Sequence, residues 1–212
     1  PELPAVSLLV TQADPATPVT MAPAPADAFG ATAPHLLHEG LTRVDADAVL
    51  GGEGQALGLI EEVADYATAL LCAEAVGGIR YANDTTLEYL KTRRQFGVPI
   101  GTFQALQHRM VEMVISYVQP RSMACLACVM VETADAAERR RVISAAKIKI
   151  ADACRHVSQE SVQMHGGMGM TEELKVSHTF RRLTMIAQTF GDAEHHLERF
   201  AAADTVADAA KH

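Results

Sequence analysis

The stretch Gln163–Leu174, QMHGGMGMTEEL, combines a histidine, three methionines and three glycines at the expected end of a long helix. Glycine adopts the left-handed conformation that closes many helices, so capping alone explains one glycine here. The adjacent Gly167 exceeds that need. Bare backbone also lets a ligand approach more closely than a side chain would allow. The stretch therefore has two interpretations, a helix end and a ligand-contacting loop.

Two further clusters contain residue types that could do chemistry. Cys125 and Cys128, in the run CLAC, have the spacing of a redox or metal-binding pair. No second pair of cysteine or histidine residues at ligand spacing lies nearby, and the surroundings are apolar, so we expect buried small residues and no metal site. The basic run ERRRV, Glu138–Val142, is expected to form a solvated helix face, with a phosphate site as the alternative.

The overall composition is that of a soluble globular protein. Of the 212 residues, 49% are hydrophobic, which is enough for a substantial core. The net charge of -8 argues against a nucleic-acid partner, because phosphate binding needs clustered Lys and Arg. No apolar run reaches the length of about 18 residues that crosses a bilayer, and we expect no membrane partner. The few cysteines fit a reducing compartment, and we expect a cytoplasmic protein.

Two parts of the chain differ in the elements that they predict. Residues 1–52 contain most of the prolines and short β-like runs such as SLLV, which predict strands and loops. From residue 53 onward, apolar residues three and four apart predict long helices. The stripe on the first helix is Leu59, Val63, Tyr66, Leu70, Ala73 and Gly77. The stripe on the second is Phe103, Leu106, Met110, Met113 and Tyr117.

Proline, glycine and capping residues predict where the helices begin and end. The run FGVPIG predicts a tight bend around Pro99, with a second helix from about Thr102. Pro120 is expected to kink or locally break that helix. Thr133 is a predicted N-cap for a third helix. A fourth helix over about 172–188 and a fifth after it complete a bundle of mostly antiparallel helices.

Three stretches occur in one order along the chain: EYLKTRRQFGVPIGTFQALQHRMVEM, QESVQMHGGMGMTEEL and FRRLTMIAQTFGDAEHH. Together they resemble the C-terminal part of the acyl-CoA dehydrogenase family, and their wording is particularly similar to small subunits of pimeloyl-CoA dehydrogenase-like enzymes. The resemblance implies a mainly α fold, in which residues 53–212 form the family's C-terminal helical bundle. Residues 1–52 would then be the end of its middle β-domain. Roughly half of a usual subunit is absent, and such a chain is expected to hold FAD weakly by itself.

The resemblance also implies a cofactor site. In that family, FAD lies between the β-domain of one subunit and the helical bundle of its neighbour. The residues that correspond by position to the bundle's part of this site are Arg93, Gln95, Phe96, Gln104, Gln163, Gly166 and Gly167. Arg93 would make charge-assisted bonds to diphosphate oxygens. The alternative is that Arg93 is a surface charge, Phe96 a core residue and Gly166 only a cap, and the ordered set favours the cofactor site.

The family's usual catalytic base is missing. Family members usually carry a glutamate directly before the glycine that precedes the last helix, where Phe190 stands here. A second subgroup carries its base at the position of Ala67, beside an arginine that is Thr68 here. None of these side chains can remove a proton from a substrate. Asp192 and Asp65 could substitute only if the backbone or the substrate shifts, so no catalytic residue is assigned.

The resemblance thus implies an oxidoreductase of fatty acid metabolism, a flavoprotein that dehydrogenates an acyl-CoA thioester between its α and β carbons with FAD. The expected partners are the acyl-CoA substrate, an electron-transfer acceptor protein and further subunits in a homo- or hetero-tetramer. The alternative is a non-catalytic subunit that completes the flavin site of a hetero-oligomeric acyl-CoA dehydrogenase, which would account for Phe190. A helical interaction module without flavin would leave Arg93, Gln104 and the glycine pair unexplained.

Overall fold

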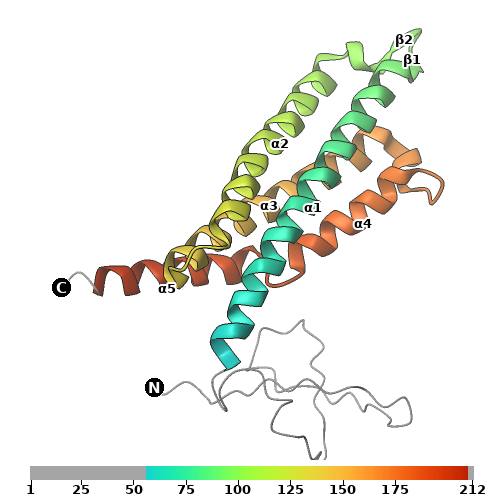
Figure 1. Ribbon diagram of the computed structural model, residues 1–212. Helices are drawn as coiled ribbons and strands as arrows, with labels where there is room; N and C mark the ends of the chain where they lie inside the picture. Colours follow the sequence, from blue (N-terminus) through green and yellow to red (C-terminus); the bar gives the residue numbers. More distant parts are fainter. Residues whose placement is uncertain (1–55, 210–212) are drawn as a thin grey trace, which may run out of the picture. The chain divides into compact units, whose positions relative to one another are not determined.

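The computed structural model describes residues 56–209, most of which lie in five long helices (Figure 1). The helices are α1 (Ala56–Thr92), α2 (Gln104–Met130), α3 (Ala136–His165), α4 (Lys175–Gln188) and α5 (Ala193–Ala209). The short elements are β1 (Arg94–Gln95), β2 (Val98–Pro99) and the 3-10 helices η2 (Ile100–Thr102) and η3 (Gly166–Met170). Residues from Asp65 to His212 form one compact unit, and those up to Ala64 belong to another. The predicted helical bundle is confirmed, and the β-domain predicted for residues 1–52 lies outside the described residues.

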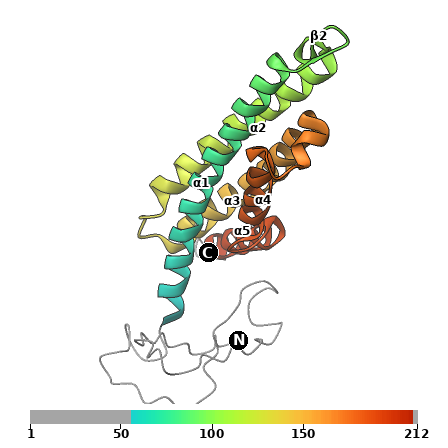
Figure 2. The ribbon, with the colours of Figure 1, turned by 90° about the vertical axis from the view of Figure 1, so that its right-hand side faces the viewer.

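The central helix of the bundle is α3, which packs against α2, α4 and α5. Figure 2 shows α1 and α2 side by side, with α3, α4 and α5 next to them. Ile143, Ile150, Val157 and Met164 recur every seven residues along α3, and all four are buried. A seven-residue spacing returns to nearly the same side of a helix, so these side chains form one continuous core stripe. Ile79 of α1 belongs to the same core cluster as three of them.

The apolar stripe predicted on α1 turns out to be an exposed face. All six of its residues are exposed, including Tyr66 and Leu70. The buried face of the helix instead carries mostly small and polar residues, namely Asp65, Thr68, Cys72, Ala75 and Ala82, together with Ile79. Small side chains let neighbouring helices approach closely. Close packing, rather than a larger apolar area than that of the exposed stripe, therefore makes this the buried face of α1. The pattern of large apolar residues on α1 therefore identified a surface without a partner among the described residues.

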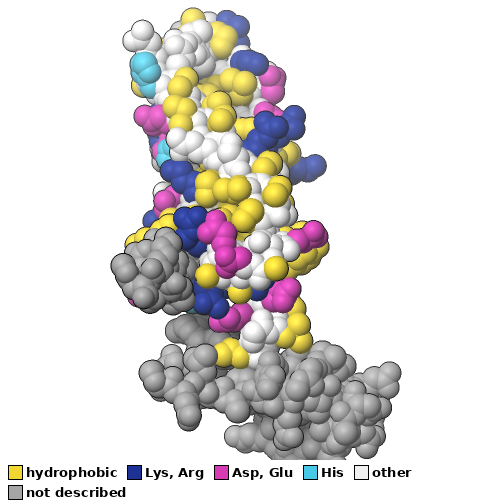
Figure 3. Space-filling model, turned by 60° about the vertical axis from the view of Figure 1, so that its left-hand side comes forward, with side chains coloured by type: hydrophobic (Ala, Val, Ile, Leu, Met, Phe, Trp, Pro, Cys, Tyr) yellow, Lys and Arg dark blue, Asp and Glu magenta, His cyan; other side chains and the backbone are white. Residues whose placement is uncertain are grey.

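Helix α2 is apolar on two faces. Met110 and Met113 are buried, as their stripe predicted. A second face exposes Val111, Val114, Ile115, Val118, Leu126 and Val129. By length and composition alone α2 is apolar enough to cross a membrane, and 22% of its most apolar window is buried. Figure 3 shows patches of hydrophobic side chains along this side of the bundle.

Three predicted boundaries need correction. The N-cap of α3 is Asp135 and not Thr133, because the Asp135 carboxylate accepts two first-turn amide hydrogens at 3.0 and 3.1 Å. Helix α2 begins at Gln104, since a 3-10 turn takes up the residues before it, and it continues unbroken through Pro120. Helix α4 begins at Lys175, three residues later than predicted, because η3 and a turn occupy the preceding chain.

Candidate functional site

A two-stranded hairpin lies at one end of the bundle, between α1 and α2 (Figure 1). Its two-residue loop is Phe96–Gly97, and both residues have positive φ angles, 55° and 81°. Such tight hairpin turns favour this left-handed conformation, which a phenylalanine rarely adopts. The Phe96 side chain is 91% exposed, with Phe103 edge-on at 6.1 Å between ring centroids. Phe96 is therefore no core residue. A strained backbone that exposes an aromatic ring is typical of a contact site.

All seven residues that the resemblance assigns to a cofactor are exposed. Four lie on the hairpin or beside it, and three lie where α3 ends. Tyr89 connects the two groups, because its hydroxyl donates to the His165 carbonyl at 3.3 Å and its ring lies 4.4 Å from the His165 imidazole. Tyr89 is one turn before Arg93, and His165 directly precedes Gly166. The structure thus brings both groups to the same end of the bundle, as a shared ligand would require.

Arg93 differs from its neighbours in having no internal partner. Within residues 56–209 its guanidinium makes no hydrogen bond or ion pair, whereas the Arg94 guanidinium donates to the Gly97 carbonyl at 2.8 Å. Further along α2, Arg109 pairs with Glu160 at 2.6 Å. A guanidinium offers five donors that match the oxygens of a phosphate. Arg93 therefore remains available for an anion from outside the described residues.

The two glycines at the end of α3 have different roles. Gly166 has a φ of 60°, and its amide donates to the Gln163 carbonyl, so Gly166 closes the helix. Gly167 lacks a positive φ, and a Cβ at this position would meet no atom within 4 Å. No contact among the described residues requires glycine there. The open space beside the Gly167 backbone fits a cofactor that lies against it.

The corner between α4 and α5 contains Phe190, which stands where the family's base is usual. Phe190 has a φ of 59° and Gly191 a φ of 101°, so two successive residues are left-handed. Lys147 of α3, which is fully buried, donates to the carbonyls of Ile186 at 3.0 Å, Ala187 at 3.1 Å and Gly191 at 2.8 Å. Burial lowers the pKa of Lys147. The lysine thus joins the end of α4 to the corner.

His196 of α5 holds the same corner from the other side. Its Nε2 donates to the Phe190 carbonyl at 3.0 Å, and its Nδ1 lies 3.3 Å from the Ser144 hydroxyl. Burial lowers the pKa of His196 to about 3, so the imidazole is neutral at neutral pH. A neutral ring that donates from Nε2 must accept at Nδ1, so Ser144 donates to it. Phe190 is therefore anchored through its backbone, while 51% of the residue stays exposed.

The two carboxylates that could replace the base are both engaged. Asp65 is 2% exposed and pairs with Arg139 at 3.3 Å and Arg199 at 2.7 Å. Asp192 accepts the His195 amide hydrogen at 2.9 Å, and such backbone hydrogen bonds lower its pKa. Asp65 is thus held between two guanidinium groups, and Asp192 caps the start of α5. Arg139 also shows that the basic run is not wholly a solvated face.

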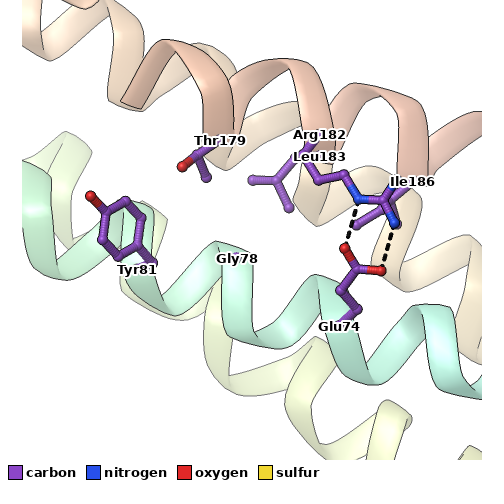
Figure 4. A pocket seen from close by; sticks show the side chains of 7 residues that line it. All are labelled: Glu74, Gly78, Tyr81, Thr179, Arg182, Leu183 and Ile186. Carbon is purple, nitrogen blue, oxygen red and sulfur yellow. Dashed lines mark hydrogen bonds and ion pairs between the residues drawn. The ribbon is translucent and has the colours of Figure 1, made fainter. Parts of the chain in front are cut away.

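A groove of about 220 Å³ lies between α1 and α4 (Figure 4). Gly78, Leu183 and Ile186 line it with apolar surface, and Tyr81 and Thr179 lie at one end. Its charged side is an ion pair in which Arg182 donates to both Glu74 oxygens, at 2.6 and 2.7 Å.

Helices α1 and α4 run antiparallel along the groove, since Thr179 and Tyr81 lie at one end and Arg182 pairs with Glu74 further along (Figure 4). Helix α4 ends at Gln188, two residues before Phe190, and neither Phe190 nor Ala67 lines the groove.

The cysteine prediction was wrong for the CLAC pair. Cys125 and Cys128 are exposed, whereas Cys72 and Cys154 are buried. Burial raises the pKa of each buried thiol to about 12, so both stay protonated. Among residues 56–209 no group of three or more potential ligands could hold a metal ion.

Sequence reasoning missed the buried lysine behind the corner. Lys147 was hidden because it lies among alanines and isoleucines in a helical stretch. A signal was present, since Lys147 lies seven residues from the buried Cys154 and four from Ile143, on the inner side of α3. A charged residue at a core position is rare unless it has partners. That position could have indicated a buried polar contact.

Comparisons with known proteins agree with this arrangement. The profile of the family described as "Acyl-CoA dehydrogenase, C-terminal domain" matches residues 55–203. Acyl-CoA dehydrogenase IpdE2 of Mycolicibacterium smegmatis is 34% identical over 154 residues, 73% of this chain and 47% of that protein. The chain spans about half the length of the curated relatives that it matches.

Two solved structures share the fold at moderate identity. A structure described as PigA with FAD and proline has a TM-score of 0.69 and 28% identity, and the match covers 75% of this chain and 41% of that chain. A Tcur3481–Tcur3483 steroid ACAD variant has the same TM-score and 28% identity, over 77% of this chain and 44% of that one.

Proposed function

Because this chain belongs to the acyl-CoA dehydrogenase family, we propose that it is part of an FAD-dependent oxidoreductase acting on an acyl-CoA thioester. The reaction would introduce a double bond between the α and β carbons of the acyl group. Bound FAD supplies the redox step, acceptance of a hydride. The observation that supports the proposal best is the set of seven exposed residues at one end of the bundle. The FAD-bound relative supports the choice of cofactor.

The bundle's own contribution would be to hold the adenine and diphosphate end of a flavin that a neighbouring subunit carries. Arg93 would bind diphosphate oxygens, and Gly167 would let the cofactor lie against the backbone. Residues 53–212 would be the helical bundle and residues 1–52 the end of the β-domain. Fatty acid metabolism, an electron-transfer acceptor protein and a cytoplasmic location belong to the same proposal.

A second candidate is a supporting subunit in a hetero-oligomeric enzyme. Phe190 and Ala67 cannot accept a proton, and Asp65 and Asp192 are held by arginines and by a helix N-terminus. Proton abstraction would then belong to the partner chain, while this chain completes the flavin site.

The full-length protein tests the cofactor site directly. Purified wild-type protein, or its complex with a partner, is expected to be yellow and to convert acyl-CoA to enoyl-CoA with an artificial electron acceptor. Arg93→Ala should weaken FAD binding about 10- to 100-fold, because a hydrogen bond to a charged group contributes about 1.5–3 kcal/mol. FAD retained through gel filtration and its dissociation constant are the measurements.

The control for Arg93→Ala is Arg80→Ala on the same helix, whose guanidinium pairs with Asp84 at 3.6 Å on the surface. That variant should bind FAD like the wild type, and both variants should keep their helical content. Unchanged FAD binding in Arg93→Ala would show that Arg93 is a surface charge.

The exposed face of α2 supports the proposed tetramer. Val114 and Val118 lie one turn apart on it, both at least 44% exposed. Such a face is stabilised when another chain covers it. The double variant Val114→Glu with Val118→Glu should dissociate the assembly, as light scattering after gel filtration would show. The control Thr184→Glu with Gln188→Glu adds the same charge on α4 and should leave the assembly intact. An assembly that stays intact in both double variants would place the interface elsewhere.

A further inference from the structure

We propose that Lys147 and His196 are positioning residues that hold Phe190, at the corner between α4 and α5, as a fixed aromatic wall for the acyl group. Neither side chain would touch the substrate. Both act on the backbone of the corner. The inference rests on the proposed function only where it names an acyl group as the ligand of this wall.

The backbone of the corner is strained, and several side chains hold it in this conformation. Phe190 is one of two non-glycine residues with a positive φ among residues 56–209, and the other is Phe96 of the hairpin. A residue keeps such a conformation only when its surroundings impose it, and these residues cluster at functional sites. Lys147 fixes the Gly191 carbonyl, His196 fixes the Phe190 carbonyl, and Asp192 fixes the start of α5.

Helix capping alone does not explain a buried lysine here. The last carbonyls of α4 could be satisfied by water or by an exposed lysine on the same helix. Lys147 instead reaches from α3, is fully buried, and donates to residues on both sides of the corner. Burial of an ammonium group carries a large desolvation cost, which three carbonyl oxygens offset only in one geometry. The contact therefore fixes the corner in a single position relative to α3.

The anchored backbone exposes an aromatic ring rather than burying it. Phe190 is half exposed, although a phenylalanine next to a core would ordinarily pack inward. A fixed and exposed phenyl ring suits contact with a saturated acyl chain. In the proposed function the acyl group lies beside this corner, because Phe190 occupies the position where the family usually carries its base.

Fluorine NMR on the full-length assembly tests the positioning. A para-fluorophenylalanine at Phe190 should give one sharp resonance, which Lys147→Met should shift and split into several. His196→Leu should do the same, whereas His196→Gln keeps an N–H donor and should restore a single resonance. Lys91→Met, at an exposed lysine that pairs with Glu88, is the matched control and should change nothing.

A second label at Phe103, on the hairpin side of the bundle, should stay unchanged in every variant. Folded Lys147→Met and His196→Leu proteins with an unaltered Phe190 resonance would overturn the positioning role. If Lys147→Met does not fold, the comparison of His196→Leu with His196→Gln decides. A label that moves in both His196 variants alike would also overturn it.

Acyl-CoA titration tests the wall itself. Short, medium and long saturated acyl-CoA thioesters are added in turn, and at least one should shift the Phe190 resonance while the Phe103 resonance stays still. No shift with any of the three would overturn the wall assignment. The same samples report whether FAD is retained, so a protein that binds FAD but leaves Phe190 unmoved refutes this inference without refuting the proposed function.

Discussion

Phe190→Glu is expected to raise the rate of acyl-CoA dehydrogenation by the full-length assembly about 10²–10⁴-fold, the usual contribution of a general base. The corner already fixes the backbone of this residue through Lys147 and His196. A glutamate would therefore project from the same place as the phenyl ring. In a homo-oligomer every subunit should gain activity, and in a hetero-oligomer a second active site should appear per pair of subunits. Steady-state rates with an artificial electron acceptor provide the measurement.

The matched control is Phe190→Gln, which has the length of glutamate but cannot accept a proton at neutral pH. It should show none of the increase that Phe190→Glu gives. The contrary outcome is a wild-type homo-oligomer that already turns over at ordinary rates and loses this activity on Asp192→Asn, or on Asp65→Asn in protein that remains folded. A relocated carboxylate would then be the base, and the chain would belong to a complete enzyme.

Asp65→Asn is expected to reduce the free energy of unfolding by about 3–5 kcal/mol, because it leaves two buried or half-buried guanidinium groups without their carboxylate. Asp65 bonds to both Arg139 and Arg199, and all three side chains are at most 18% exposed. An amide of the same size keeps the packing, so the loss reports the charge. Denaturant unfolding of the full-length protein at constant concentration measures it.

The exposed ion pair in the groove provides the comparison. Glu74→Gln breaks the contact with Arg182, whose geometry is bidentate and shorter, yet both side chains are about half exposed. Solvent screens such a pair, so the free energy of unfolding should change by less than about 1 kcal/mol. Equal losses in the two variants would mean that the Asp65 pairs contribute no more than a surface contact.

Local chemistry in the sequence predicted much of the fold. Pro99 and the glycines around it predicted a tight bend between the first two helices, and the glycines after His165 predicted the end of α3. The inner face of α1 was not predictable from hydrophobic spacing, because Asp65, Thr68 and Ala75 are buried there while larger residues such as Leu70 are exposed. Packing between small residues depends on the neighbouring helices, which a single periodic pattern does not describe.

The candidate site shows the same division. Composition explained one glycine after α3, and only the family resemblance joined Arg93, Gln104 and Gly167 into a set. The exposure of Phe96 depends on the sign of its φ, which follows from hairpin length rather than from residue type. Lys147 meets carbonyls that are about forty residues away in the chain, so no local pattern could reveal its partners.

The two-residue turn at Phe96–Gly97 makes the length of this loop as important as its composition. Arg94 faces Pro99 and Gln95 faces Val98 across the hairpin, so one inserted or deleted residue would shift this register. Side chains alternate between the two faces of a strand, and a shift by one would turn Gln95 to the opposite side. Substitutions in this loop keep the hairpin register, whereas the insertion or deletion of a residue shifts it. Related proteins should therefore vary in the side chains of this loop far more than in its length.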